Sequence, residues 1–74
     1  MKTYEATQKI NGEWVNIQVS ENGGITYCYN DGITVRRSIG KIQMSDVNQF
    51  IKRLISEGYN VTIRTPKIYE SERK

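Results

Sequence analysis

The sequence predicts a single α+β domain in which one helix packs on one face of a five-stranded antiparallel sheet. Residues 45–57 have the apolar periodicity of an amphipathic helix, whereas most other apolar residues alternate with polar ones, as they do in strands. Short turns rich in asparagine and glycine separate the first strands closely enough to form hairpins. A chain of 74 residues has room for one small core, so residues 1–74 are treated as one domain.

The first hairpin is predicted to join residues 2–10 to residues 13–20. Asn11 and Gly12 lie between these segments, and both residue types tolerate the positive φ that a two-residue hairpin turn requires. Apolar and polar residues alternate in both segments, which places the apolar ones on a common face. These residues are Tyr4, Ala6, Ile10, Val15, Ile17 and Val19.

Two further strands are predicted at residues 25–29 and 33–39. The turn before the first contains Asn22, Gly23 and Gly24, and the turn between the two is the sequence Asn-Asp-Gly at 30–32. In the shorter strand Ile25, Tyr27 and Tyr29 share one face. In the longer strand Ile33, Val35 and Ile39 share one side, which is interrupted by Arg37.

The predicted helix begins at Ser45, which stands at the N-cap position, and Asp46 adds a negative charge to its first turn. Gly58 follows the last periodic residue, as the left-handed C′ position prefers. Ile42 and Met44 are expected to fill the junction between sheet and helix. The apolar stripe of the helix consists of Val47, Phe50, Ile51, Leu54 and Ile55.

A fifth strand is predicted at residues 59–65, with Tyr59, Val61 and Ile63 facing inward, and the charged tail 67–74 is expected to be partly flexible. The order of elements is therefore ββββαβ. We favour the spatial strand order 5-1-2-3-4, because it keeps the whole sheet antiparallel. The alternative places the fifth strand parallel to the fourth through a right-handed crossover.

One helix covers one face of such a sheet, so the other face is expected to be mixed and polar. Its large aromatic residue, Trp14, is either the anchor of an interface or packs across strands against Thr26 or Cys28. The residues assigned to this face are Trp14, Asn16, Gln18, Thr26, Cys28, Thr34, Arg36, Ser38, Thr62 and Arg64.

Basic residues are concentrated in the second half of the chain. Residues 1–35 carry a net charge of −2, whereas residues 36–74 carry +5. Either this asymmetry serves an anionic partner or it only makes the surface soluble. A basic strip along one sheet edge would bind nucleic acid, with Trp14 or Tyr59 available for stacking. The same charges would otherwise protect a solvated edge from aggregation. The strip consists of Arg36, Arg37, Lys41, Arg64 and Lys67.

The composition argues against most catalytic chemistry. The chain has no histidine, which removes the commonest general base and metal ligand, and its one cysteine, Cys28, is expected to be a packed strand residue. No nucleotide-binding, hydrolase or calcium-binding motif is present. We therefore expect a non-enzymatic protein without a metal or other cofactor. The absence of a signal-like or membrane-spanning apolar segment predicts a cytoplasmic protein.

The segment from Asn16 to Gly23, the Asn-Asp-Gly turn at 30–32, and Ser45 opening a helix that contains Phe50 resemble small anti-CRISPR proteins of phages. The resemblance covers about half of the chain. It implies a phage or mobile-element protein that binds and inhibits nucleic-acid-handling machinery in the cytoplasm of the host, such as a CRISPR effector. The other interpretations are a small basic nucleic-acid-binding domain and a structural or assembly protein acting as a homodimer. The candidate partner-binding residues are Trp14, Arg36, Arg37, Lys41 and Arg64.

Overall fold

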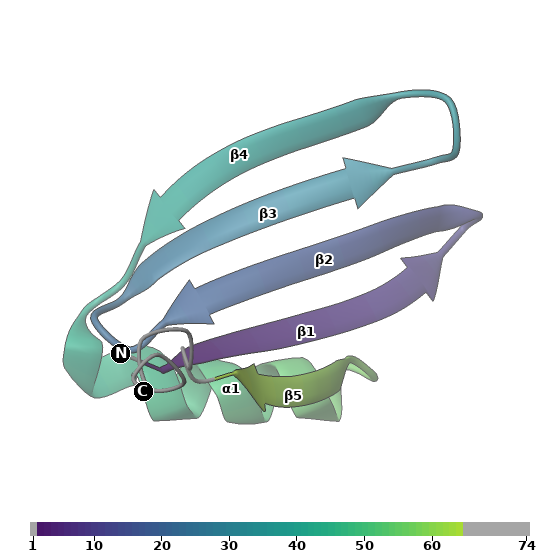
Figure 1. Ribbon diagram of the computed structural model, residues 1–74. Coiled ribbons are helices and arrows are strands. Elements are labelled where there is room, and N and C mark those ends of the chain that lie inside the picture. The colour runs from purple at the N-terminus through teal and green to yellow at the C-terminus, as the bar shows by residue number, and fades with distance from the viewer. Residues whose placement is uncertain (1, 65–74) are drawn as a thin grey trace, which may run out of the picture.

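The computed structural model describes residues 2–64 and shows one small α+β domain. The predicted order ββββαβ is confirmed, with a short 3-10 turn before the helix (Figure 1). The elements are β1 (Thr3–Ile10), β2 (Glu13–Ser20), β3 (Gly24–Asn30), β4 (Val35–Lys41), η1 (Met44–Asp46), α1 (Val47–Ser56) and β5 (Asn60–Arg64). The predicted tail 67–74 lies outside the described residues.

The strands form one antiparallel sheet of order β4-β3-β2-β1-β5, which confirms the favoured topology. Consecutive strands from β1 to β4 are neighbours, and β5 returns to pair with β1. The turn between β1 and β2 has the predicted geometry, because Asn11 and Gly12 have φ angles of 50° and 78°. β4 and β5 are therefore the two edges of the sheet.

Helix α1 covers one face of this sheet and encloses the core. Figure 1 shows it lying beside β5, while β4 lies at the other side of the sheet. Its last turn ends in a Schellman motif, since the N–H of Tyr59 donates to the Leu54 carbonyl and that of Gly58 to the Ile55 carbonyl. Gly58 has a φ of +94°, as its predicted C′ role requires.

The start of the helix differs from the prediction. Ser45 is not the N-cap: it lies inside the 3-10 turn, and Asp46 occupies the N-cap position of α1 without a side-chain hydrogen bond to the helix. The 3-10 turn closes with a bond from the Asp46 N–H to the Gln43 carbonyl at 2.9 Å. This turn takes up the first residues of the segment, so the N-cap of the α-helix lies one residue later than predicted.

The core is made by residues that alternate on the sheet and recur on the helix. Its buried members are Ala6, Val15, Ile17, Val19, Ile25, Val47, Ile51 and Leu54, and partly buried Tyr4, Tyr27, Tyr29, Ile42, Phe50, Tyr59 and Val61 pack around them. Three residues predicted to face inward are largely exposed instead. These are Met44, Ile55 and Ile63.

The predicted phase of the fourth strand is wrong. Cys28 pairs with Arg37 and Thr26 with Ile39, so Val35, Arg37, Ile39 and Lys41 lie on the face away from the helix. Arg36 and Ser38, predicted to lie on that open face, are on the helix side instead. The reason is the connection between β3 and β4: Ile33 and Thr34 belong to the loop, and the strand begins at Val35.

The segment that leads from β4 to the helix is tied back to the turn between β2 and β3. The Ile42 N–H donates to the Gly23 carbonyl at 2.9 Å, and Gly23 has a φ of +101°. A Cβ atom on Gly23 would lie 2.1 Å from the Ile42 carbonyl oxygen. Only glycine therefore allows these two backbones to approach.

Candidate binding surface on the open face of the sheet

The face of the sheet without the helix presents side chains in cross-strand rows. The term open face is used below for this whole face of the sheet, and three of its rows run from β1 to β4. In that order they contain Glu5, Gln18, Thr26 and Ile39; Thr7, Asn16, Cys28 and Arg37; and Lys9, Trp14, Asn30 and Val35. The open face thus combines hydroxyl and amide groups in its centre with an aromatic residue at one end and a basic, partly apolar strand at its edge.

A groove of about 650 Å³ crosses this surface over four strands. Its side chains are supplied by the open-face positions of β1 to β4, which the twist of the sheet brings around a shallow hollow. They are Thr7, Trp14, Asn16, Gln18, Thr26, Cys28, Asn30 and Arg37. Hydroxyl and amide groups that donate and accept hydrogen bonds therefore lie beside one large apolar ring.

Trp14 is the most prominent apolar group of the groove, and 53% of its surface is exposed. It lies in one row with Lys9 and Asn30, and the Lys9 ammonium is 5.9 Å from the centre of its ring. Of the two residues predicted to pack against it, Thr26 lies two rows away and Cys28 lies in the next row. Its ring is held at one side by a cation and leaves much of its apolar area open to a partner.

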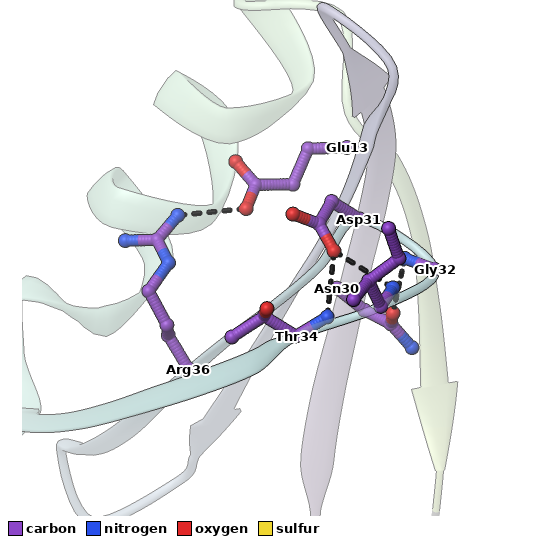
Figure 2. Close-up of polar contacts among 7 residues, drawn as sticks. Glu13, Asn30, Asp31, Gly32, Thr34 and Arg36 are labelled. Atoms are coloured by element: carbon purple, nitrogen blue, oxygen red, sulfur yellow. Dashed lines mark hydrogen bonds and ion pairs between the residues drawn. The ribbon is translucent and has the colours of Figure 1, made fainter.

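The two adjacent arginines of β4 have different surroundings. Arg36 points to the helix side, where it lies over the Tyr29 ring at 4.8 Å and donates to the Glu13 carboxylate at 2.7 Å. Arg37 lines the groove on the open face and forms no ion pair within residues 2–64. Of these two predicted site residues, Arg37 alone belongs to the open face. Figure 2 shows the contact between Arg36 and Glu13.

The loop between β3 and β4 fixes where Arg36 and Arg37 point. The Asp31 carboxylate accepts the N–H groups of Thr34 and Ile33 at 2.7 and 2.8 Å, and the Asn30 side chain accepts that of Gly32 (Figure 2). These bonds, the one from Thr34 first, hold the pKa of Asp31 below its usual value. The loop is therefore ordered locally and sets the register in which β4 starts.

Within residues 2–64, the members of the predicted basic strip do not share one edge of the sheet. Arg64 is on the open face as expected, but it lies on β5, at the edge opposite to Arg37 and Lys41. Its guanidinium is 3.4 Å from the Glu5 carboxylate. Lys67 lies outside the described residues. Because the strip required β4 and β5 to share an edge, the strand order itself separates its members.

Glu5 is the acidic group of the open face and is mostly enclosed, with 20% of its side chain exposed. The Asn16 side-chain amide donates to it at 2.9 Å. This hydrogen bond is the main cause that lowers the pKa of Glu5, and the nearby Arg64 and Gln18 add to it against the opposing effect of burial. Glu5 therefore compensates part of the positive charge of the open face.

Cys28 lies half-buried in the middle row, between Asn16 and Arg37. Within residues 2–64 there is no group of three or more cysteine, aspartate and glutamate residues that could hold a metal ion. The same residues include no helix of the length and apolarity needed to cross a lipid bilayer. The groups that line the groove are hydrogen-bonding, aromatic and cationic.

Comparison of the chain with models of protein families, with curated proteins and with solved structures found no match. The resemblance to small anti-CRISPR proteins therefore stays a prediction from the sequence.

Proposed function

We propose that this protein is a non-enzymatic binding protein that recognises another protein through the open face of its sheet. The observation that carries the proposal is the position of Trp14 and Arg37 in one groove, on the face that the helix leaves uncovered. Tryptophan and arginine are the residue types that most often dominate the energy of protein interfaces. Amide and hydroxyl groups between them supply the hydrogen bonds that give such an interface its specificity.

The distribution of aromatic residues favours a protein partner over nucleic acid. Binding of single strands uses several exposed rings on which successive bases stack. Here Tyr4, Tyr27 and Tyr29 lie on the helix side of the sheet and pack against the core. Trp14 is the one aromatic side chain that the described strands place on the open face. Two of the predicted cations, Arg36 and Arg64, already have acidic neighbours.

Within this proposal, the partner belongs to nucleic-acid-handling machinery, as the sequence resemblance implies. Such an inhibitor acts by occupying a surface of the machinery and needs no catalytic groups of its own. A set of purified CRISPR effectors provides the test. We expect target cleavage by one of them to fall when the protein is added and to recover with Trp14→Ala. Unchanged cleavage by all effectors would restrict the proposal to protein binding in general.

The direct test of the binding surface is site-specific photo-crosslinking in a lysate of the source cells. A photoreactive phenylalanine replaces Gln18, which is exposed in the groove, or Ile55, which is exposed on the helix. We expect a crosslinked protein from the Gln18 site that disappears with Trp14→Ala, and none from the Ile55 control. Equal crosslinking from both sites, or none from either, would contradict recognition through the open face.

Single-stranded nucleic acid is the second candidate, because Trp14 and Arg37 also suit one stacked base beside a phosphate. It is tested by titrating random single- and double-stranded nucleic acid over a series of salt concentrations. Micromolar binding with a steep salt dependence that Arg37→Glu abolishes would favour this candidate. Arg36→Glu is the matched control, since Arg36 lies on the other face and should change the titration far less.

A further inference from the structure

Strand β4 is an edge of the sheet, and its side chains are exposed from end to end. Within residues 2–64 it has one neighbour, β3, and six of its seven residues are exposed, with Gly40 half-buried. An exposed strand edge presents unpaired N–H and C=O groups that another chain can bind. Two apolar residues in this edge are far from buried: Val35 is 57% exposed and Ile39 is 85% exposed.

The hydrogen bonds at both ends of the β3–β4 ladder show which backbone groups face outward. The Asp31 N–H donates to the Thr34 carbonyl, and the Ile42 N–H donates to that of Gly23. Bonded and non-bonded pairs alternate along an antiparallel ladder. The bonded pairs between these ends therefore include Tyr27 with Ser38, and the backbone groups of Arg36, Ser38 and Gly40 point toward β3. The outward-pointing groups belong to Val35, Arg37, Ile39 and Lys41.

The same four residues carry their side chains on the open face, and they alternate between apolar and basic. Val35 and Ile39 are apolar, and Arg37 and Lys41 are cationic. A strand added to this edge places its own side chains directly opposite them, close enough for cross-strand pairing. The complementary strand would place apolar residues opposite Val35 and Ile39 and acidic residues opposite Arg37 and Lys41.

We propose that the partner supplies an extended segment in which apolar and acidic residues alternate at every second position, on one face. This segment pairs with the outer edge of β4 as a sixth strand of the sheet. This inference rests on the proposed function, since the added strand would lie at the border of the groove that contains Trp14. Backbone hydrogen bonds would provide affinity, and the alternating side chains would provide specificity.

A second copy of the chain is a poorer occupant of this edge. Antiparallel pairing of two β4 strands about Ser38 would set Arg37 opposite Ile39 of the other copy and Val35 opposite Lys41. The arginines of the two copies would then be diagonal neighbours, and shifting the register toward either end of the strand sets cations directly opposite one another. Like charges at such positions are destabilising. The charge of the edge thus disfavours self-pairing and favours an acidic strand.

The test is amide hydrogen exchange measured by NMR, with a synthetic peptide as the probe. The peptide is as long as β4 and alternates valine with glutamate at every second position, with threonine between them. We expect it to slow exchange at the Arg37 and Ile39 amides at least about tenfold, because these groups become hydrogen-bonded. Exchange at the Arg36 and Ser38 amides, already bonded to β3, should change little.

Control peptides, two protein variants and one backbone modification make the result specific. A peptide of the same composition without the alternation, and one with lysine in place of glutamate, should bind about tenfold more weakly or not at all. Arg37→Glu should weaken binding of the alternating peptide by a similar factor, whereas Lys52→Glu, on the exposed side of the helix, should not. A synthetic chain with an N-methyl group on Ile39 should lose about fivefold to tenfold in affinity, since one outward donor is removed.

Each alternative outcome overturns the inference in a recognisable way. No binding of the peptide at millimolar concentration contradicts the inference. Binding that shifts only the NMR signals of Trp14 and Gln18, without slowing exchange of the Arg37 and Ile39 amides, contradicts it as well. A dimer formed through β4 without the peptide, seen by sedimentation, would assign the edge to a second copy. In each of these cases crosslinking from Gln18 still decides whether the open face binds a partner, so the two proposals fail separately.

Discussion

The two faces of the sheet carry side chains of opposite character on the same strands. On the helix side, β2 contributes Val15, Ile17 and Val19, which are at most 5% exposed. On the open face the intervening residues include Trp14, Asn16 and Gln18, which line the groove. Because successive residues of a strand point to opposite faces, one segment of eight residues serves both surfaces. We infer that the covered face provides most of the stability and that the open face is free to bind.

The largest effect on stability should come from truncating a buried side chain between the helix and the sheet. Leu54 is 4% exposed within the core, so Leu54→Ala should lower the free energy of unfolding by about 2–4 kcal/mol. Ile55→Ala is the matched control on the same helix, because Ile55 is 55% exposed, and it should cost less than about 1 kcal/mol. Urea denaturation measures both. Similar losses for the two variants would show that α1 packs on the sheet through a different stripe.

The next effect on stability concerns the contact between the β2–β3 turn and the segment that leads to the helix. Gly23→Ala should lower the free energy of unfolding by about 2 kcal/mol, since it adds a clash with the Ile42 carbonyl to the strain of a positive φ. Gly12→Ala introduces similar strain, at a φ of +78°, but no atom lies within 4 Å of the new Cβ. The melting temperature of Gly23→Ala should therefore be lower than that of Gly12→Ala in thermal denaturation. The reverse order would contradict the close approach of these backbones.

A smaller effect tests whether the open face also contributes to stability. The pKa of Glu5 is lowered in the folded protein, so its stabilising effect is present above its ordinary pKa and is lost as the pH falls through the folded value. Glu5→Gln should cost about 1 kcal/mol or less at pH 7, and the difference from the unmodified protein should vanish once the pH lies below the lowered pKa of Glu5 in the folded protein. Stability measured against pH checks this.

Asn16→Ala should raise the pKa of Glu5 toward its ordinary value, because it removes the donor that stabilises the carboxylate. An NMR titration of the Glu5 carboxyl carbon measures the change. An unaltered titration in Asn16→Ala would assign the shift to Arg64 instead.

The smallest effect on stability should come from the residue with the largest expected effect on binding. Trp14→Ala should change the free energy of unfolding by about 0.5 kcal/mol or less, because the ring is half exposed and lies outside the core. The variant should nevertheless lose the crosslink formed from Gln18. A loss of stability as large as that of Leu54→Ala would mean that the open face is a second core and would overturn the division between the two faces.

The sequence predicts the covered face well because burial imposes a period on it. The alternation in residues 13–20 and the stripe through Val47, Ile51 and Leu54 both correspond to buried residues. The phase of β4 cannot be predicted in this way, because neither face of this edge strand is buried. The spacing of Ile33, Val35 and Ile39 therefore does not indicate which side of the strand faces the helix. The extra loop residues are held by the Asp31 side chain, which the spacing of turn residues did not reveal.

The candidate site was predicted in part, and the missing information is tertiary. Trp14 and Arg37 were identified and lie in one groove. The sequence does not show that Arg36 and Arg64, unlike Arg37, have acidic neighbours. Their ion pairs with Glu13 and Glu5 join strands that only the folded sheet brings together. The groove residues Thr7 and Asn30 carry no signal of their own in the sequence. Their role follows from the register of β1, β2 and β3.

The pairing of β5 with β1 also has a consequence for how the chain folds. Each pairing from β1 to β4 joins adjacent strands, whereas Thr3 pairs with Arg64 at the two ends of the described chain. Closing a loop of this length costs conformational entropy and slows folding. The four consecutive strands β1 to β4 are therefore expected to pair before β5 docks on β1. A circular permutant that links these neighbouring ends and opens at Asn11 would make the last ladder local and the first one distant. The ladder between β1 and β2 would then be the last to form.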